Sequence, residues 1–268
     1  MLPSRSEWAA ALGRTLALPW RLVDPGTCRR CRVPTDGRVL CGDCAANLCG
    51  SINPCRRCAG PIGPNLDNTD CARCRGLRWS FDRVRGLGEY RHRPLQQVIV
   101  AAKSPGGTAA GMLLGRVWTE RHGAEVRDAV DAVVPVPRHW RDRLLGGTSA
   151  SERIAEAVAR RLGKPLLLHA VAKSRHTAKQ THLAPTDRKR NLQNAFTARR
   201  RLHGSRLLLI DDVLTTGTTA HRVAATLTEA GATVTVGVIA RGVGETVKAS
   251  TKPATLATPS DRAADDPA

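Results

Sequence analysis

Apolar residues recur with two different periods along the chain, and the two periods alternate between residues 79 and 243. A helical period, seen in the spacing of Leu95, Ile99 and Ala102, predicts a helix over 94–103, and the same criterion predicts helices over 109–122, 149–162 and 218–230. Short apolar runs predict strands over 79–90, 132–136, 165–168, 207–210 and 233–240. Strands that alternate with helices are typical of βαβ units, so we expect an α/β fold with a parallel sheet.

The strand predicted over 207–210 ends in an unusual group of polar residues. Residues 207–220 read LLLIDDVLTTGTTA, in which an aliphatic run precedes Asp211 and Asp212. Open α/β sheets bind ligands at the carboxyl ends of their strands. Adjacent carboxylates at such an end can accept hydrogen bonds from vicinal hydroxyls or help to hold a divalent cation. The simpler alternative is a strand followed by an ordinary acidic turn.

The residues that follow the acidic pair are suited to a phosphate group. Thr215–Thr219 supply hydroxyls and backbone N–H groups where the helix over 218–230 begins, and a helix N-terminus attracts anions. Gly217 lets the backbone approach a ligand closely and tolerates a positive φ. A plain Ser/Thr-type N-cap is the alternative. The order of apolar run, carboxylates and Thr/Gly turn favours a sugar-phosphate site.

Cysteines near the N-terminus form four C-x-x-C pairs: Cys28/Cys31, Cys41/Cys44, Cys55/Cys58 and Cys71/Cys74. Two such pairs supply the four thiolates of a closed, tetrahedral structural zinc site, so we expect two zinc ions. Consecutive pairing would give ribbons over 28–44 and 55–74, but the spacing also allows interleaved pairing. Disulfides would need an oxidising compartment, and residues 1–20 lack a secretory signal. A redox dithiol is a further alternative, and the ninth cysteine, Cys49, is expected to be a buried or idle thiol.

Composition sets limits on partners and location. The 268 residues carry a formal charge of +19, which favours contacts with nucleic acid, phospholipid headgroups or a polyphosphorylated substrate. Arginines chosen for solubility would give the same charge. Aromatic residues make up 3%, so the stacking platforms of general single-strand binders are scarce. No run approaches the roughly eighteen apolar residues of a transmembrane helix. We therefore expect a cytoplasmic protein without a transmembrane segment.

The chain divides by composition into four predicted regions. An N-terminal amphipathic helix lies within 1–24, a double zinc ribbon spans 25–78, the α/β domain spans 79–243, and 244–268 reads as a disordered tail. Within the α/β domain, residues 173–191 are polar, basic and long for a connection. Connections of that length are usually functional or disordered.

Two resemblances sharpen this prediction. The segment IDDVLTTGTT is similar to the phosphoribosyl-pyrophosphate (PRPP) signature of type I phosphoribosyltransferases. The zinc ribbons followed by FDRVRGLGEY, PLQQVIVAAK, DAVVPVPRHW, KQTHLAPTDRKRNLQNAF and LLLIDDVLTTGTT resemble the ComF family, which is linked to DNA uptake in naturally competent bacteria. The resemblance implies a type I phosphoribosyltransferase-like, Rossmann-type parallel sheet behind an N-terminal double zinc ribbon. One departure is the run at 144–149, where family members usually carry Arg-Gly-Phe-Asn-Gln, although Thr148 or Ser149 can still cap the helix that follows.

The resemblance also implies roles for individual residues. Asp211 and Asp212 would bind the ribose and Mg²⁺, and the 5′-phosphate would lie on the loop formed by Val213, Leu214, Thr215, Thr216, Gly217, Thr218 and Thr219. For the pyrophosphate we nominate Lys103 and Arg138, with Arg175 or Lys179 from the basic connection, although a solvated surface charge is the ordinary fate of each. The implied reaction is displacement of pyrophosphate from C1 of PRPP by a nitrogen nucleophile.

Two hypotheses about function remain open at this point. The first is an enzyme that transfers a phosphoribosyl group to an unidentified acceptor. The second is a non-catalytic PRPP-fold binding protein that contacts single-stranded DNA or competence proteins. The zinc module occupies the place in the chain where a base-binding hood would be expected, so the sequence does not name an acceptor. It does not predict an oligomeric state either.

Overall fold

A four-stranded parallel sheet forms the centre of the protein, seen in a computed structural model that describes residues 26–50, 54–62, 71–72, 74–138, 149–173 and 195–242. The strand order is β1-β6-β5-β2. The strands are β1 (Val84–Glu89), β2 (Ala132–Pro135), β5 (Arg206–Leu214) and β6 (Thr233–Arg241). All three neighbouring pairs run parallel, so every carboxyl end lies at the same edge of the sheet. The predicted α/β class and parallel sheet are confirmed.

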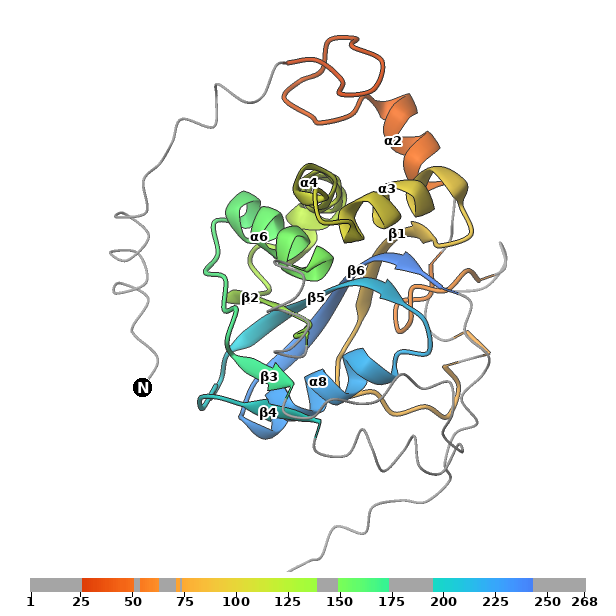
Figure 1. Cartoon of the computed structure of the whole chain (residues 1–268). Coiled ribbons are helices and arrows are strands. Elements are labelled where there is room, and N and C mark those ends of the chain that lie inside the picture. Colours follow the sequence, from red (N-terminus) through yellow and green to blue (C-terminus); the bar gives the residue numbers. More distant parts are fainter. Residues whose placement is uncertain are drawn as a thin grey trace, which may run out of the picture.

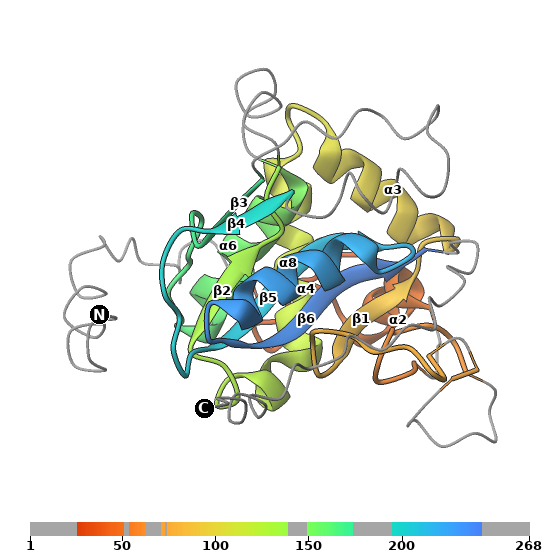
Figure 2. The same cartoon turned by 90° about the horizontal axis from the view of Figure 1, so that it is seen from below.

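Helices cover both faces of this sheet and make a three-layered domain (Figure 1). One face carries α3 (Arg93–Lys103), α4 (Thr108–Val126) and α6 (Ala150–Leu162). The other face carries α8 (Thr218–Glu229), which lies across the strands when the molecule is viewed from below (Figure 2). A two-stranded antiparallel ribbon, β3 (Val171–Lys173) with β4 (Phe196–Ala198), lies beside α8. The basic connection predicted over 173–191 begins at the end of β3 and otherwise lies outside the described residues.

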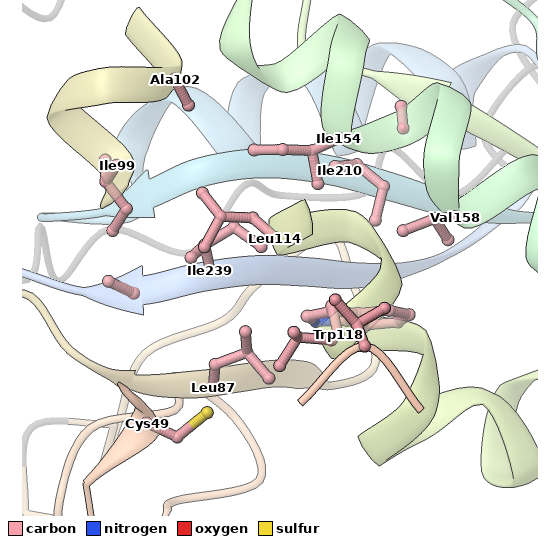
Figure 3. Packing of buried hydrophobic residues seen from close by; sticks show 14 of the residues in the cluster. Cys49, Leu87, Ile99, Ala102, Leu114, Trp118, Ile154, Val158, Ile210 and Ile239 are labelled. Atoms are coloured by element: carbon pink, nitrogen blue, oxygen red, sulfur yellow. The ribbon is translucent and has the colours of Figure 1, made fainter. Parts of the chain in front are cut away.

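Strand β5 is apolar throughout its first half because both of its faces are covered. Successive side chains of a strand point to opposite faces. Leu208 and Ile210 accordingly join the core beneath α3, α4 and α6, where Ile210 lies among Leu114 and Ile154 (Figure 3). Leu207 and Leu209 join the core beneath α8. A continuous aliphatic run is what such a doubly covered strand requires.

Helix α6 lies unusually close to α4, and this closeness sets the position of its first turn. A Cβ atom on Gly111 would lie 2.8 Å from Cβ of Arg153, and one on Gly115 would lie 2.6 Å from Cβ of Ala157. Only glycine therefore allows this approach. At the start of α6, Ser149 and Glu152 form a complete capping box. The predicted cap at this helix is confirmed with Ser149 as the capping residue.

The cysteine-rich region adds a short helix that the sequence analysis did not predict. Helix α2 (Gly42–Cys49) begins at the second C-x-x-C pair of the first cysteine group, carries Cys44 and contacts α3 and β1. Leu48 and Cys49 join the core of Leu87 and Leu95, and Cys49 is buried, as expected for this thiol (Figure 3). Its backbone comes so close to β1 that a Cβ on Gly88 would lie 2.1 Å from the Cys49 carbonyl oxygen.

Some predicted boundaries were wrong for identifiable reasons. The strand expected over 79–90 begins only at Val84, because Trp79 and Phe81 stack on each other before the chain enters the sheet. The strand expected over 165–168 is a single bridge between Val133 and Leu166, since Pro165 has no N–H to donate and a turn follows.

Other elements are longer than predicted. Helix α4 continues to Val126 and is held at His122, whose Nε2 lies 3.1 Å from the Gly86 carbonyl oxygen. Strand β5 continues to Leu214 because β6 stays paired with it. The helix predicted within 1–24 and the tail at 244–268 lie outside the described residues. Within the described ranges, no helix combines the length and apolar character needed to cross a membrane.

Candidate functional site

The acidic pair lies within β5 and not in a turn after it, which corrects the prediction. The strand stays paired with β6 through Val213 and Leu214. Asp211 is only 9% exposed, and its Oδ1 accepts hydrogen bonds from the Ser151 hydroxyl at 3.2 Å and from the Asp212 N–H at 2.9 Å. The first turn of α6 therefore reaches the carboxyl edge of the sheet. The strand geometry fixes the direction of the two carboxylates more firmly than a turn would.

The two carboxylates have opposite electrostatic environments. Burial raises the pKa of Asp211 well above the usual range, and the charge of Asp212 raises it further. Burial also raises the pKa of Asp212, but the Lys103 ammonium, 2.6 Å from Oδ2, offsets this and leaves the pKa below its ordinary value. Asp212 thus carries the charge of the ligand-free pair. A bound divalent cation would favour ionisation of both.

Lys103, one of the nominated basic residues, is brought directly to the acidic pair. It is the last residue of α3, and the carboxyl end of that helix is held by Arg153. The buried Arg153 guanidinium donates to three backbone carbonyls, those of Ala102 at 3.0 Å, Ser104 at 3.1 Å and Pro105 at 3.3 Å. Sequence reasoning missed Ser151 and Arg153. A serine and an arginine early in an amphipathic helix carry no signal of burial before the helices are packed.

A loop of threonines and a glycine follows β5 directly. Residues 215–217 bend between the strand and α8, and Gly217, the N-cap residue, adopts φ 83°, a positive value that glycine tolerates. The Thr216 hydroxyl lies 2.9 Å from that of Thr218 and accepts a hydrogen bond from the Thr218 N–H at 3.3 Å. A Cβ on Gly217 would lie 2.9 Å from the Trp79 ring. The loop therefore presents hydroxyls and the positive end of α8 beside the acidic pair.

Of the other nominated basic residues, Arg138 lies within the described residues, and it is not paired with the acidic carboxylates. Arg138 lies exposed just after β2, at the same edge of the sheet, and it makes no hydrogen bond or ion pair with Asp211 or Asp212 among the contacts of the described residues. Arg175 and Lys179 lie outside the described residues.

The eight pairing cysteines gather into two separate clusters. One consists of Cys28, Cys31, Cys41 and Cys44, and the other of Cys55, Cys58, Cys71 and Cys74, with all four Sγ atoms of a cluster within 4.8 Å of one another. Consecutive pairing is thereby confirmed. A tetrahedral zinc site with Zn–S bonds of about 2.3 Å places neighbouring sulfurs about 3.8 Å apart. The Cys31–Cys41 and Cys58–Cys71 Sγ distances are both 3.6 Å, so both clusters fit structural zinc.

Comparison with known proteins places this site in a family context. Residues 140–264 match the family model described as "Phosphoribosyl transferase domain". The DNA utilization protein YhgH of Salmonella typhi is 31% identical over 223 residues, which cover 79% of this chain and 94% of that protein. Competence protein F of Haemophilus influenzae is 27% identical over 212 residues, which cover 72% and 85% of the two chains.

Among solved structures, the phosphoribosylpyrophosphate synthetase of Mycobacterium smegmatis matches with 22% sequence identity and a TM-score of 0.32 over 48% of this chain and 33% of that one. The phosphoribosyltransferase-like parallel sheet and the two cysteine clusters are the combination expected from the sequence. The chain belongs to the ComF family of competence-related proteins with a phosphoribosyltransferase domain.

Proposed function

We propose that this protein binds PRPP together with Mg²⁺ at the carboxyl end of β5 and transfers the phosphoribosyl group to a nitrogen acceptor. One observation carries the proposal. The Asp211–Asp212 pair, which already holds the Lys103 ammonium at 2.6 Å from Asp212, lies directly before a loop of hydroxyls that opens α8. Carboxylates for a sugar, donors for a phosphate and a cation for a pyrophosphate thus meet at one edge of the sheet.

Each part of PRPP has a matching group in this arrangement. The N–H groups that open α8 and the hydroxyls of Thr216 and Thr218 would hold the 5′-phosphate. Asp211 and Asp212 would accept hydrogen bonds from the ribose hydroxyls and help to hold Mg²⁺, which prefers oxygen ligands. A bound cation would compete with Lys103 for the carboxylates, and the Lys103 ammonium would then be able to turn to the pyrophosphate.

The proposed reaction is a displacement at C1 of the ribose. A nitrogen lone pair forms the new bond to C1 while the bond from C1 to the pyrophosphate oxygen breaks, and the electron pair leaves with the pyrophosphate. The protein contributes position and charge stabilisation, since negative charge grows on the leaving group. Mg²⁺, when bound, would supply further neutralisation of the pyrophosphate charge.

Calorimetric titration with PRPP and Mg²⁺ tests the binding site. The double variant Asp211→Asn/Asp212→Asn should lose binding, because it removes the carboxylates that would bind Mg²⁺ and accept hydrogen bonds from the ribose hydroxyls. Asp131→Asn is a matched control, since Asp131 pairs with Arg206 at the opposite edge of the sheet, with 2.7 Å between Oδ1 and Nη2. The control should bind like the wild type. Unchanged affinity in the double variant would overturn the assignment.

A second candidate function is a non-catalytic role in which the PRPP site serves recognition and the protein contacts single-stranded DNA or competence proteins. It is favoured by the net charge of +19 and by relatives that are named a DNA utilization protein and a competence protein. Incubation with PRPP, Mg²⁺ and a panel of bases and oligonucleotides separates the two. Pyrophosphate release that depends on one acceptor supports transfer, whereas binding of both ligands without release supports recognition alone.

A further inference from the structure

Arg241 lies between the second cysteine cluster and the loop of residues 213–219, which we call the phosphate loop. It is the last residue of β6, lies opposite Leu214 of β5 and is 4% exposed. Its Nη1 lies 2.6 Å from the Leu214 carbonyl oxygen and 2.6 Å from that of Gly242, and it also contacts the Thr215 carbonyl oxygen. One buried guanidinium therefore holds the backbone at the point where β5 becomes the phosphate loop.

The hydrogen bonds from Arg241 orient the backbone N–H groups that a bound phosphate would contact. In a planar trans peptide, the C=O and the following N–H point in opposite directions. Because Arg241 holds the Leu214 and Thr215 carbonyls on its own side, the N–H groups of Thr215 and Thr216 point away from Arg241. A bent loop has several alternative backbone conformations, and fixing two of its carbonyls selects one of them.

The other side of Arg241 lies against the second cysteine cluster. A Cβ placed on Gly60 would lie 3.2 Å from Sγ of Cys58 and 3.8 Å from Nε of Arg241, so the two side chains lie close together on the side of Gly60 that carries no side chain. Four thiolates and one Zn²⁺ carry a net charge of −2. The buried cation beside the cluster is therefore placed to compensate that charge.

Residues 55–60, the knuckle that carries Cys55 and Cys58, are packed closely against the sheet. The Val84 N–H donates to the Arg56 carbonyl at 2.8 Å, and a Cβ on Gly86 would lie 3.1 Å from Cβ of Ala59. Residues 55–60 thus continue the packing of β1, which pairs with β6 and so with Arg241. Displacement of the knuckle would therefore shift the end of β6, where Arg241 lies.

A second connection reaches the far end of the same loop. The chain leaves Cys74 and brings Trp79 over Gly217, where the ring stacks on Phe81 with 5.3 Å between centroids and meets His221 edge-on at 5.7 Å. The Ser80 N–H donates to Nδ1 of His221 at 3.1 Å. The second cluster is therefore linked to both ends of the phosphate loop.

The first cluster has different neighbours. Its module contacts α4, where the Val39 N–H donates to Oε1 of Glu120 at 3.0 Å, and the start of α3, where Nε2 of His92 lies 2.5 Å from the Asn47 carbonyl oxygen. These hydrogen bonds lie on the helices of the opposite layer, and α2, which carries Cys44, also packs on β1 at Gly88. The chain thus contains its own control, a second Cys₄ cluster of the same ligand chemistry.

We propose that Arg241 is a positioning residue through which metal occupancy of the second cluster, and not of the first, sets the affinity of the phosphate loop for the 5′-phosphate of PRPP. This inference rests on the proposed PRPP site. Loss of the second metal would release the knuckle, since small metal-bound modules take their fold from the ion. Arg241 would then lose its counter-charge and the loop would lose the support that orients its N–H groups.

The test compares variants in the full chain by zinc content and by calorimetric affinity for PRPP with Mg²⁺. Cys71→Ser and Cys31→Ser should each lower the zinc content by one ion per chain. Only Cys71→Ser should weaken PRPP binding, by about tenfold or more, the effect of losing charge-assisted hydrogen bonds. Equal affinity of the two variants would overturn the coupling.

If Cys71→Ser fails to fold, variants of Arg241 still test its positioning role. Arg241→Met should retain its melting cooperativity yet bind PRPP about tenfold more weakly, and Arg241→Lys should restore part of the loss because it keeps the charge. Arg127→Met is the control, since Arg127 also grips backbone carbonyls, those of Leu162 at 3.0 Å and Arg161 at 3.1 Å, on the far end of α6. Wild-type affinity in Arg241→Met would refute the positioning role, whereas a wild type that does not bind PRPP would refute the proposed function itself.

Discussion

The two cysteine clusters have the same ligands and nearly the same spacing, but they lie in different surroundings. In the first cluster Cys31 is exposed and Cys41 half-buried, and the module packs on α3 and α4. In the second cluster all four cysteines are buried, and the knuckle packs on β1 beside the phosphate loop. Ligand spacing therefore specifies the metal chemistry of a module, while the packing around it decides what the module can influence.

The two modules also contact different parts of the domain. The first contacts the start of α3, at the opposite end of that helix from Lys103, which pairs with Asp212. The second supports the loop on the 5′-phosphate side through Arg241. Among the contacts of the described residues, the second module thus lies nearer to the proposed site, which makes their separate disruption informative.

The largest expected effect on PRPP affinity comes from removing the two zinc ions stepwise with a chelator. Because Cys31 is exposed, a chelator should extract zinc from the first cluster before the second. The first equivalent of zinc released should leave PRPP affinity unchanged, and release of the second should abolish it. A colorimetric zinc indicator and parallel PRPP titrations on the same samples measure both quantities. Loss of affinity with the first equivalent would show that the exposed cluster also controls the site.

A smaller effect should separate the two ends of the ligand. Lys103→Met removes the cation expected at the pyrophosphate, so it should weaken PRPP binding about tenfold and leave the binding of ribose 5-phosphate, which has no pyrophosphate, nearly unchanged. Arg241→Met should weaken both ligands. Calorimetry with the two ligands provides the comparison. If Lys103→Met lost affinity equally for PRPP and for ribose 5-phosphate, Lys103 would not act at the pyrophosphate end of the site.

The smallest expected effect is a pH dependence of stability that originates at Asp211. Its pKa is raised in the folded protein, so the folded state binds a proton more tightly than the unfolded state does. This contribution to stability is complete below the ordinary aspartate pKa and is lost as the pH rises through the raised pKa. Asp211→Asn, which stays neutral, should therefore melt a few degrees higher than the ligand-free wild type above that range.

Thermal melts across this pH range, without ligand, test the prediction. Asp212→Asn is the matched control, because the pKa of Asp212 is lowered and the substitution removes its ion pair with Lys103. It should melt at a lower temperature than the wild type. If Asp211→Asn is destabilised to the same extent, the two carboxylates do not differ as their surroundings indicate.

Local patterns in the sequence predicted the frame of the site well. The apolar run over 207–210 identified β5 because a doubly covered strand must be continuously apolar, and Gly217 was noted as a residue that tolerates the positive φ found there. The spacing of the C-x-x-C pairs predicted two clusters, but it left the pairing open. Only the folded chain shows that each cluster uses consecutive pairs.

The residues that the sequence could not reveal meet through long-range packing. Ser151 reaches Asp211 across 60 positions, and Arg241 reaches Leu214 across 27. Both belong to ordinary amphipathic or strand segments, in which a polar residue is usually solvated. The carboxyl end of β5 was also missed, since Asp211 and Asp212 resemble turn residues until the pairing with β6 is known.

The central claim is that the acidic pair and the following loop form a PRPP site. The most direct test is a calorimetric titration of PRPP with Mg²⁺ into zinc-loaded wild type and into Asp211→Asn/Asp212→Asn. Saturable binding to the wild type with one PRPP per chain, and none to the double variant, is the predicted result. Equal binding by both proteins, or no binding by either, would contradict the account.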